Sequence, residues 1–139
     1  MKKEDSARVV LDSFALVAYL QGETGKAKVE SLLRQTEAGS IELYLSIVNL
    51  GEVAYILERD VGLEKTRETL GAMDELPITF VAADRKRVLA AAHIKAQYAI
   101  SYADAFAVAL AQELDARLVS GDPELTIVES LISVEWIAR

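Results

Sequence analysis

The chain has 139 residues, of which 52% are hydrophobic and 27% charged, so its length and composition fit one globular domain with a buried core. Its formal net charge of −7 excludes a generic nucleic-acid coat, because such binding depends on lysine and arginine neutralising phosphates. The lack of cysteine excludes disulfides and thiolate metal sites. No signal-length apolar run follows the first residues, and runs such as Ala105–Ala111 are too short to cross a bilayer, so we expect a cytoplasmic protein with no membrane partner.

Short β-branched runs alternate along the chain with longer helical stretches. In chain order, the pattern predicts a strand at residues 8–11, helices at 13–20 and 24–36, a strand at 41–46, helices at 47–59 and 63–74, a strand at 77–81, helices at 85–97 and 102–114, and strands at 117–120 and 133–137. We expect Asp84 and Ser101 to cap the helices that follow them. This alternation predicts a three-layer α/β/α fold, in which helices cover both faces of a parallel sheet.

Four carboxylates fall where such a fold would gather them: Asp12, Glu52, Asp104 and Asp122. Asp12 and Asp122 each follow a predicted strand, and ligands of open α/β sheets bind beyond the carboxyl ends of the strands. Glu52 lies in a helix with apolar neighbours four residues away on both sides, a costly place for an unpaired carboxylate. Asp104 begins a wholly apolar helix, whose dipole favours an ionised acid. Carboxylates are ligands for Mg²⁺ or Mn²⁺, and four together would repel one another without a cation, so they predict a metal site.

Each acid also has an ordinary structural explanation. Asp12 can cap the helix that follows it, and Asp122 suits a turn. Asp104 completes a capping-box pattern that begins at Ser101. Glu52 can have a tertiary partner that the sequence does not reveal. Without a metal site, four independent explanations would all have to be true at once, whereas one metal site accounts for all four acids.

The segments around these acids resemble the PIN-domain ribonucleases, specifically the VapC toxins of VapBC-type toxin–antitoxin pairs. The resemblance covers nearly the whole chain and rests on residues 10–16, 46–53, 101–105 and 118–122. It implies a single PIN domain over residues 1–139, a sheet with strand order 3-2-1-4-5, and a catalytic and metal-binding role for the same four acids. Ser13 and Ser120 match hydroxyls of the family, and Ser120 would hydrogen-bond a ligand carboxylate or a metal-bound water.

The activity that this resemblance implies is metal-dependent hydrolysis of RNA phosphodiester bonds. An endoribonuclease of this kind uses one or two Mg²⁺ or Mn²⁺ ions and needs no protein nucleophile. Asp12, Glu52 and Asp104 are expected to be direct or water-bridged ligands, and Asp122 to act through water. The implied partners are an RNA substrate, a VapB-type antitoxin and a second copy of the chain in a homodimer. Two other functions stay open: Mg²⁺-dependent phosphoryl transfer with Asp12 as nucleophile, and a non-catalytic module that binds RNA or protein.

Other charged and aromatic residues receive plainer interpretations. Arg85, Lys86 and Arg87 can meet RNA phosphates, but an ordinary solvated helix face is favoured. Glu124 is grouped with the surface charges, although it lies only two residues past Asp122. The tyrosines and the tryptophan form no ladder of the kind that stacks single-stranded bases. The sequence specifies neither the RNA target nor the number of metal ions.

Overall fold

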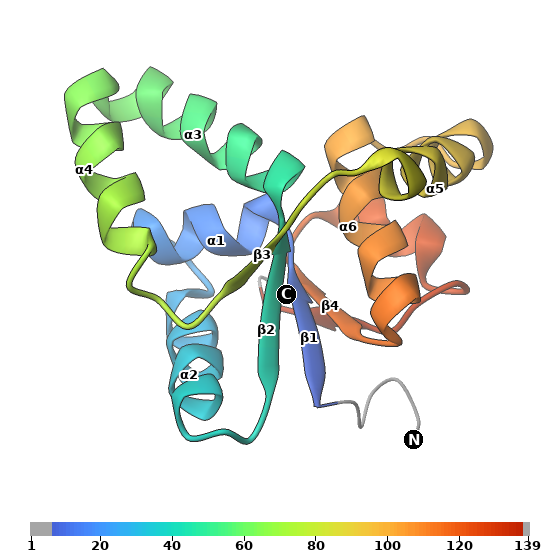
Figure 1. Cartoon of the computed structure of the whole chain (residues 1–139), viewed down its shortest axis with the longest axis horizontal. Coiled ribbons are helices and arrows are strands. Elements are labelled where there is room, and N and C mark those ends of the chain that lie inside the picture. Colours follow the sequence, from blue (N-terminus) through green and yellow to red (C-terminus); the bar gives the residue numbers. More distant parts are fainter. Residues whose placement is uncertain (1–6, 138–139) are drawn as a thin grey trace.

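The computed structural model describes residues 7–137, which fold around one five-stranded sheet (Figure 1). All neighbouring strands pair in parallel, in the spatial order β3-β2-β1-β4-β5. The strands are β1 Arg8–Leu11, β2 Glu42–Ser46, β3 Thr79–Val81, β4 Arg117–Ser120 and β5 Val134–Trp136. The predicted α/β class and strand order 3-2-1-4-5 are therefore confirmed, with β3 and β5 each shorter than predicted.

Helices cover both faces of this sheet (Figure 1). One face carries α1 Ser13–Leu20, α2 Lys26–Glu37, α3 Ile47–Val61 and α4 Leu63–Met73; the other carries α5 Arg85–Gln97 and α6 Tyr102–Leu114. Side chains alternate along β1, so Val9 and Leu11 pack under the first group while Val10 packs under the second. The three-layer architecture follows from this alternation.

The most deeply buried helix is α6. Residues Ala105 to Ala111 are all buried, as expected of a helix that is apolar around its whole circumference. Its small alanine side chains let it lie close to both the sheet and α5. The N-terminus of α6, which carries Asp104, is thereby held at a fixed place relative to the strands.

A short 3-10 helix, η2 Pro123–Val128, follows β4 and was not predicted. Because the strands run parallel, the carboxyl ends of β1, β2 and β4 meet at one edge of the sheet, where α1, α3 and η2 begin. The N-terminus of α6 faces the same region. The fold therefore brings four predicted acids to one end of the molecule.

Candidate metal centre

Asp12 connects β1 to α1 and caps that helix. Its Oδ1 accepts a hydrogen bond from the Ala15 amide at 2.8 Å, so the capping role that the sequence allowed is real. The residue is completely buried, and Oδ2 has no hydrogen-bond partner. A buried carboxylate oxygen without a partner is costly unless a cation or a proton joins it. Capping thus uses one oxygen of Asp12 and leaves the other for a ligand.

Asp104 lies in the first turn of α6. The Ser101 hydroxyl oxygen accepts a hydrogen bond from the Asp104 amide at 3.1 Å, which confirms Ser101 as the cap of this helix. The Asp104 side chain is nearly buried, and it stands where the α6 dipole is positive. As at Asp12, helix capping and ligand binding do not compete, because the capping bond uses the hydroxyl of Ser101 and the backbone of Asp104.

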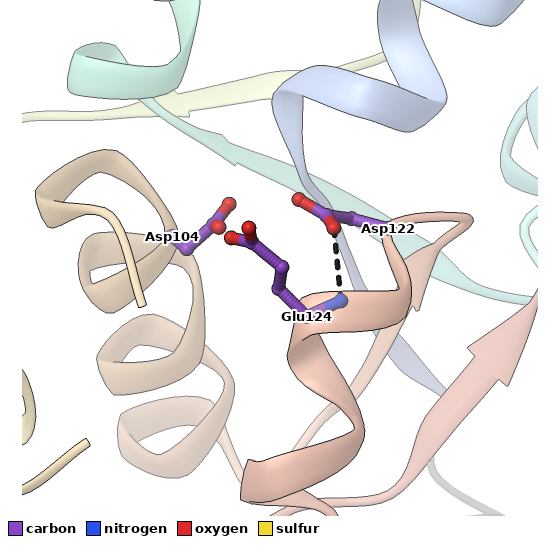
Figure 2. Close-up of side chains that lie close together, drawn as sticks. All are labelled: Asp104, Asp122 and Glu124. Atoms are coloured by element: carbon purple, nitrogen blue, oxygen red, sulfur yellow. Dashed lines mark hydrogen bonds between the residues drawn. The ribbon is translucent and has the colours of Figure 1, made fainter. Parts of the chain in front are cut away.

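The turn after β4 supplies two further acids. Asp122 caps η2: its Oδ1 accepts a hydrogen bond from the Glu124 amide at 3.0 Å (Figure 2). The buried Ser120 hydroxyl accepts a hydrogen bond from the Asp122 amide at 3.0 Å and thereby fixes the turn. Glu124, which the sequence analysis grouped with the surface charges, is exposed but points its carboxylate toward Asp104 and Asp122 (Figure 2).

These carboxylates gather in one cluster. Asp104, Asp122 and Glu124 each offer an oxygen within 4.8 Å of the others. They line a cavity of about 260 Å³, and Glu52 from α3 lines the same cavity together with Ser13, Phe14, Ile56 and Ser101. The Tyr55 hydroxyl, three residues further along the same helix, donates a hydrogen bond to Glu52 Oε2 at 3.2 Å.

The electrostatics of the site show what this clustering costs. The pKa of Asp12 is raised to about 7, mainly by burial and in smaller part by the charges of Asp104 and Asp122, while the nearby Ser120 hydroxyl and the hydrogen bond from the Ala15 amide act in the opposite direction. Burial, followed by the charge of Asp122, raises the pKa of Asp104 to about 6, with smaller contributions from Glu52 and Glu124. All four predicted acids therefore interact electrostatically in one region.

The residues fit a divalent cation. Every candidate ligand is a carboxylate, the donor that Mg²⁺ and Mn²⁺ prefer, and Asp12 Oδ2 is buried without a partner. A bound cation would offset both the burial of these carboxylates, which is the main cause of the raised pKa values, and their mutual repulsion. Asp12, Glu52, Asp104 and Asp122 would hold it, as the sequence predicts, with Glu124 as an additional ligand or water acceptor.

Asn49 is a site residue that the sequence analysis did not single out. It is completely buried in α3, and its Nδ2 donates hydrogen bonds to the Ser13 hydroxyl at 3.0 Å and to the Ala103 carbonyl at 3.1 Å. Ser13 in turn donates to the Asn49 carbonyl. Asn49 thus links the segments next to Asp12 and Asp104, one turn before Glu52, while Ser13 makes this link rather than contacting an acid.

Replacing Asn49 with alanine is expected to loosen the metal site. Losing two buried hydrogen bonds should lower the free energy of unfolding by about 2 kcal/mol. Because groups that orient ligands affect metal binding, Mn²⁺ affinity measured by calorimetry should fall about 10- to 100-fold. Thr66→Ala is the control, since buried Thr66 donates a hydrogen bond to the Gly62 carbonyl in α4. Thr66→Ala should lower the free energy of unfolding and leave Mn²⁺ affinity unchanged. Equal Mn²⁺ affinity in Asn49→Ala and Thr66→Ala would contradict the role of Asn49.

The basic run at the start of α5 divides into two kinds of residue. Arg87 forms salt bridges with Asp84 at 3.3 Å and with Glu113 at 3.0 Å, and so attaches α5 to α6. Arg85 and Lys86 are exposed, as expected of an ordinary solvated face. Asp84 also caps α5, accepting a hydrogen bond from the Arg87 amide.

Within residues 7–137, no helix is both long enough and apolar enough to cross a membrane.

Residues 9–130 match the family model of the PIN domain. The match covers most of the chain, and the chain belongs to the PIN-domain family. Searching curated protein sequences gave no match. The acidic cluster is consistent with the metal site typical of PIN domains.

Solved structures with the same fold include several VapC toxins of VapBC toxin–antitoxin systems. VapBC2 from Rickettsia felis, bound to a DNA fragment from its promoter, matches with a TM-score of 0.70 at 14% identity, over 92% of this chain and 97% of that one. DNA-bound VapBC from Salmonella typhimurium matches with a TM-score of 0.68 at 16% identity, over 92% and 96%. VapC20 from Mycobacterium tuberculosis, a sarcin–ricin loop cleaving toxin, matches with a TM-score of 0.67 at 13% identity, over 86% and 94%.

Proposed function

We propose that this PIN domain is a metal-dependent endoribonuclease that hydrolyses RNA phosphodiester bonds, and that it acts as the toxin of a type II toxin–antitoxin pair. The observation that carries the proposal is the gathering of Glu52, Asp104, Asp122 and Glu124 around one cavity. The buried Asp12 interacts electrostatically with Asp104 and Asp122, and its Oδ2 has no hydrogen-bond partner. Such a cluster is unfavourable in a purely structural role, because it keeps two carboxyl pKa values raised.

The residues divide the work as follows. Asp12, Glu52 and Asp104 hold one or two Mg²⁺ or Mn²⁺ ions, and Asp122 acts through water. The Ser120 hydroxyl keeps Asp122 in place by accepting a hydrogen bond from the Asp122 amide. The same hydroxyl lowers the pKa of the nearby Asp12 carboxyl. When bound, the metal supplies an activated water and stabilises the charge that develops on the phosphate. An alternative with Asp12 as a phosphoryl-accepting nucleophile leaves Glu52, Asp122 and Glu124 without a role.

The toxin assignment and the partners rest on the structural neighbours, several of which are VapBC complexes. By the same analogy the chain would form a homodimer and be inhibited by a VapB-type antitoxin. VapC20, which shares the fold, cleaves the sarcin–ricin loop. We therefore expect an RNA substrate here, with a target that this likeness does not specify.

Cleavage of a mixed RNA substrate tests the proposal directly. Wild-type protein should cleave with Mn²⁺ and stop in EDTA, and Asp104→Asn should lower the rate at least about 10³-fold because metal catalysis contributes several kcal/mol. Asp74→Asn, which changes an exposed carboxylate at the end of α4, should cleave like wild type. Full activity of folded Asp104→Asn, or a wild type that neither cleaves RNA nor binds Mn²⁺, would refute it.

A further inference from the structure

Exposed aromatic side chains concentrate beside the acidic cavity. Across the part of the chain that the structure describes, three aromatic side chains are exposed: Phe14 at 41%, Tyr55 at 46% and Tyr102 at 45%. Phe14 lines the cavity itself, and the Tyr55 hydroxyl bonds to Glu52, which also lines it. The ring of Tyr102 instead packs against Phe106, with centroids 5.1 Å apart. Two exposed rings, from α1 and α3, therefore border the candidate metal centre.

Tyr55 is held in a defined orientation. Its hydroxyl is fixed to Glu52 at 3.2 Å, and the Arg59 guanidinium lies 4.7 Å from the centre of its ring. Among residues 7–137, no acidic side chain forms a salt bridge with Arg59. A cation over one ring face restricts the motion of the aromatic side chain and keeps a positive charge beside the cavity. This arrangement suits a ligand that has both a flat apolar surface and an anionic group.

The charge of the chain explains why such a surface would be needed. With a net charge of −7 and an acidic cavity, the protein cannot gain much RNA affinity from the general attraction of phosphates to basic residues. Stacking on aromatic rings does not depend on net charge, and it is open only to bases that are not already stacked in a duplex.

We propose that Phe14 and Tyr55 form a base-stacking subsite for unpaired nucleotides next to the cleaved bond, and that Arg59 contacts a neighbouring phosphate. The proposal rests on the proposed ribonuclease function, and it specifies the substrate as single-stranded RNA or an RNA loop. The two rings would hold the strand so that one phosphate lies at the acidic cluster. The sequence analysis found no ladder formed by the tyrosines and the tryptophan, and the subsite proposed here instead combines one tyrosine with Phe14.

Binding of a short single-stranded RNA that contains 2-aminopurine tests the subsite without catalysis, in EDTA at low salt. Stacking should quench 2-aminopurine fluorescence on binding. Phe14→Ala and Tyr55→Ala should each weaken binding roughly 5- to 150-fold, the range for loss of one stacked base. Tyr55→Phe should bind like wild type because it keeps the ring, and Arg59→Gln should bind more weakly, with a shallower salt dependence. Leu89→Ala, at a 57% exposed position on α5, is the matched control.

The outcomes separate this proposal from the function on which it rests. In Mn²⁺, the two alanine variants should raise KM with little change in kcat, which supports the subsite. RNA binding and KM like those of wild type in both alanine variants would overturn the subsite without contradicting the proposed ribonuclease function. The exposed rings would then be better explained as contacts for a protein partner. Base-dependent binding by a wild type that never cleaves RNA would support the subsite and refute the catalysis. Because both rings are already exposed, thermal unfolding should show that all the variants fold.

Discussion

Asp12→Asn is expected to stabilise the metal-free protein at pH 8 by about 4 kcal/mol while reducing RNA cleavage at least about 10³-fold. The two effects have one cause. In the folded chain the pKa of Asp12 is raised from 3.8 to about 7, so at pH 8 folding has to bury an ionised carboxylate. Asparagine caps helices as well as aspartate does and carries no charge, so the bond from the Ala15 amide can be kept.

The sign of the pH dependence follows from proton binding. Between pH 4 and pH 7 the folded protein holds a proton on Asp12 that the unfolded chain releases, so wild-type stability falls as the pH rises through this window. The advantage of Asp12→Asn should therefore be largest at pH 8 and shrink to below about 1 kcal/mol at pH 4. Chemical denaturation in EDTA at several pH values measures it.

Metal should reverse the order of stability. Mn²⁺ that binds the folded wild type would stabilise it by mass action, whereas the asparagine variant should gain little. Asp74→Asn, which alters an exposed carboxylate, serves as the control and should track wild type at every pH. An asparagine variant that is less stable than wild type at pH 8 in EDTA would show that Asp12 is a satisfied structural cap and not a poised ligand.

Mn²⁺ affinity should fall about 10³-fold between pH 8 and pH 5, the second large effect. Two carboxyl groups with pKa values of about 7 and about 6, Asp12 and Asp104, must lose their protons before they can bind a cation. Protonation therefore competes with metal, contributing about 100-fold through Asp12 and about tenfold through Asp104 at pH 5.

Calorimetric titration with Mn²⁺ in buffers of different ionisation enthalpy would measure both the affinity and the protons released. Glu75→Gln, at an exposed position outside the cavity, should leave the profile unchanged. Affinity that stays constant from pH 8 to pH 5, with no proton release, would mean that these two acids are not ligands.

The sequence predicted the fold well because the fold depends on local patterns. Alternation of β-branched runs and helical stretches placed every strand and six helices, with errors confined to element ends such as β3, which begins at Thr79. The missing element was η2, although Asp122 followed by Pro123 is a recognised start of a helix. A helix predicted from that signal would have placed Glu124 in its first turn, close to the strand ends and to the other acids.

The site was predicted less completely, for two physical reasons. The sequence offered helix capping and metal binding as alternatives at Asp12 and Asp122, whereas a carboxylate has two oxygens and one can cap while the other stays free. Asn49 acts through contacts with segments far away in the sequence, which no local pattern marks. The Tyr55 bond to Glu52 is a local pair three residues apart on one helix, and helical spacing could have suggested it. Exposure of Phe14 beside the cavity is likewise a property of the assembled surface.

The capping bonds at Asp12, Asp122 and Ser101 have a consequence for how a metal-dependent activity at this site would be switched on and off. Backbone amides hold the loops that carry these acids whether or not an ion is present, so the site is assembled when the chain folds. A zinc finger, by contrast, unfolds when its ion leaves. Here loss of the cation would give a fully folded, silent protein that regains activity as soon as an ion diffuses in. The supply of free Mg²⁺ or Mn²⁺ would then act as a rapid, reversible control that requires neither synthesis nor refolding.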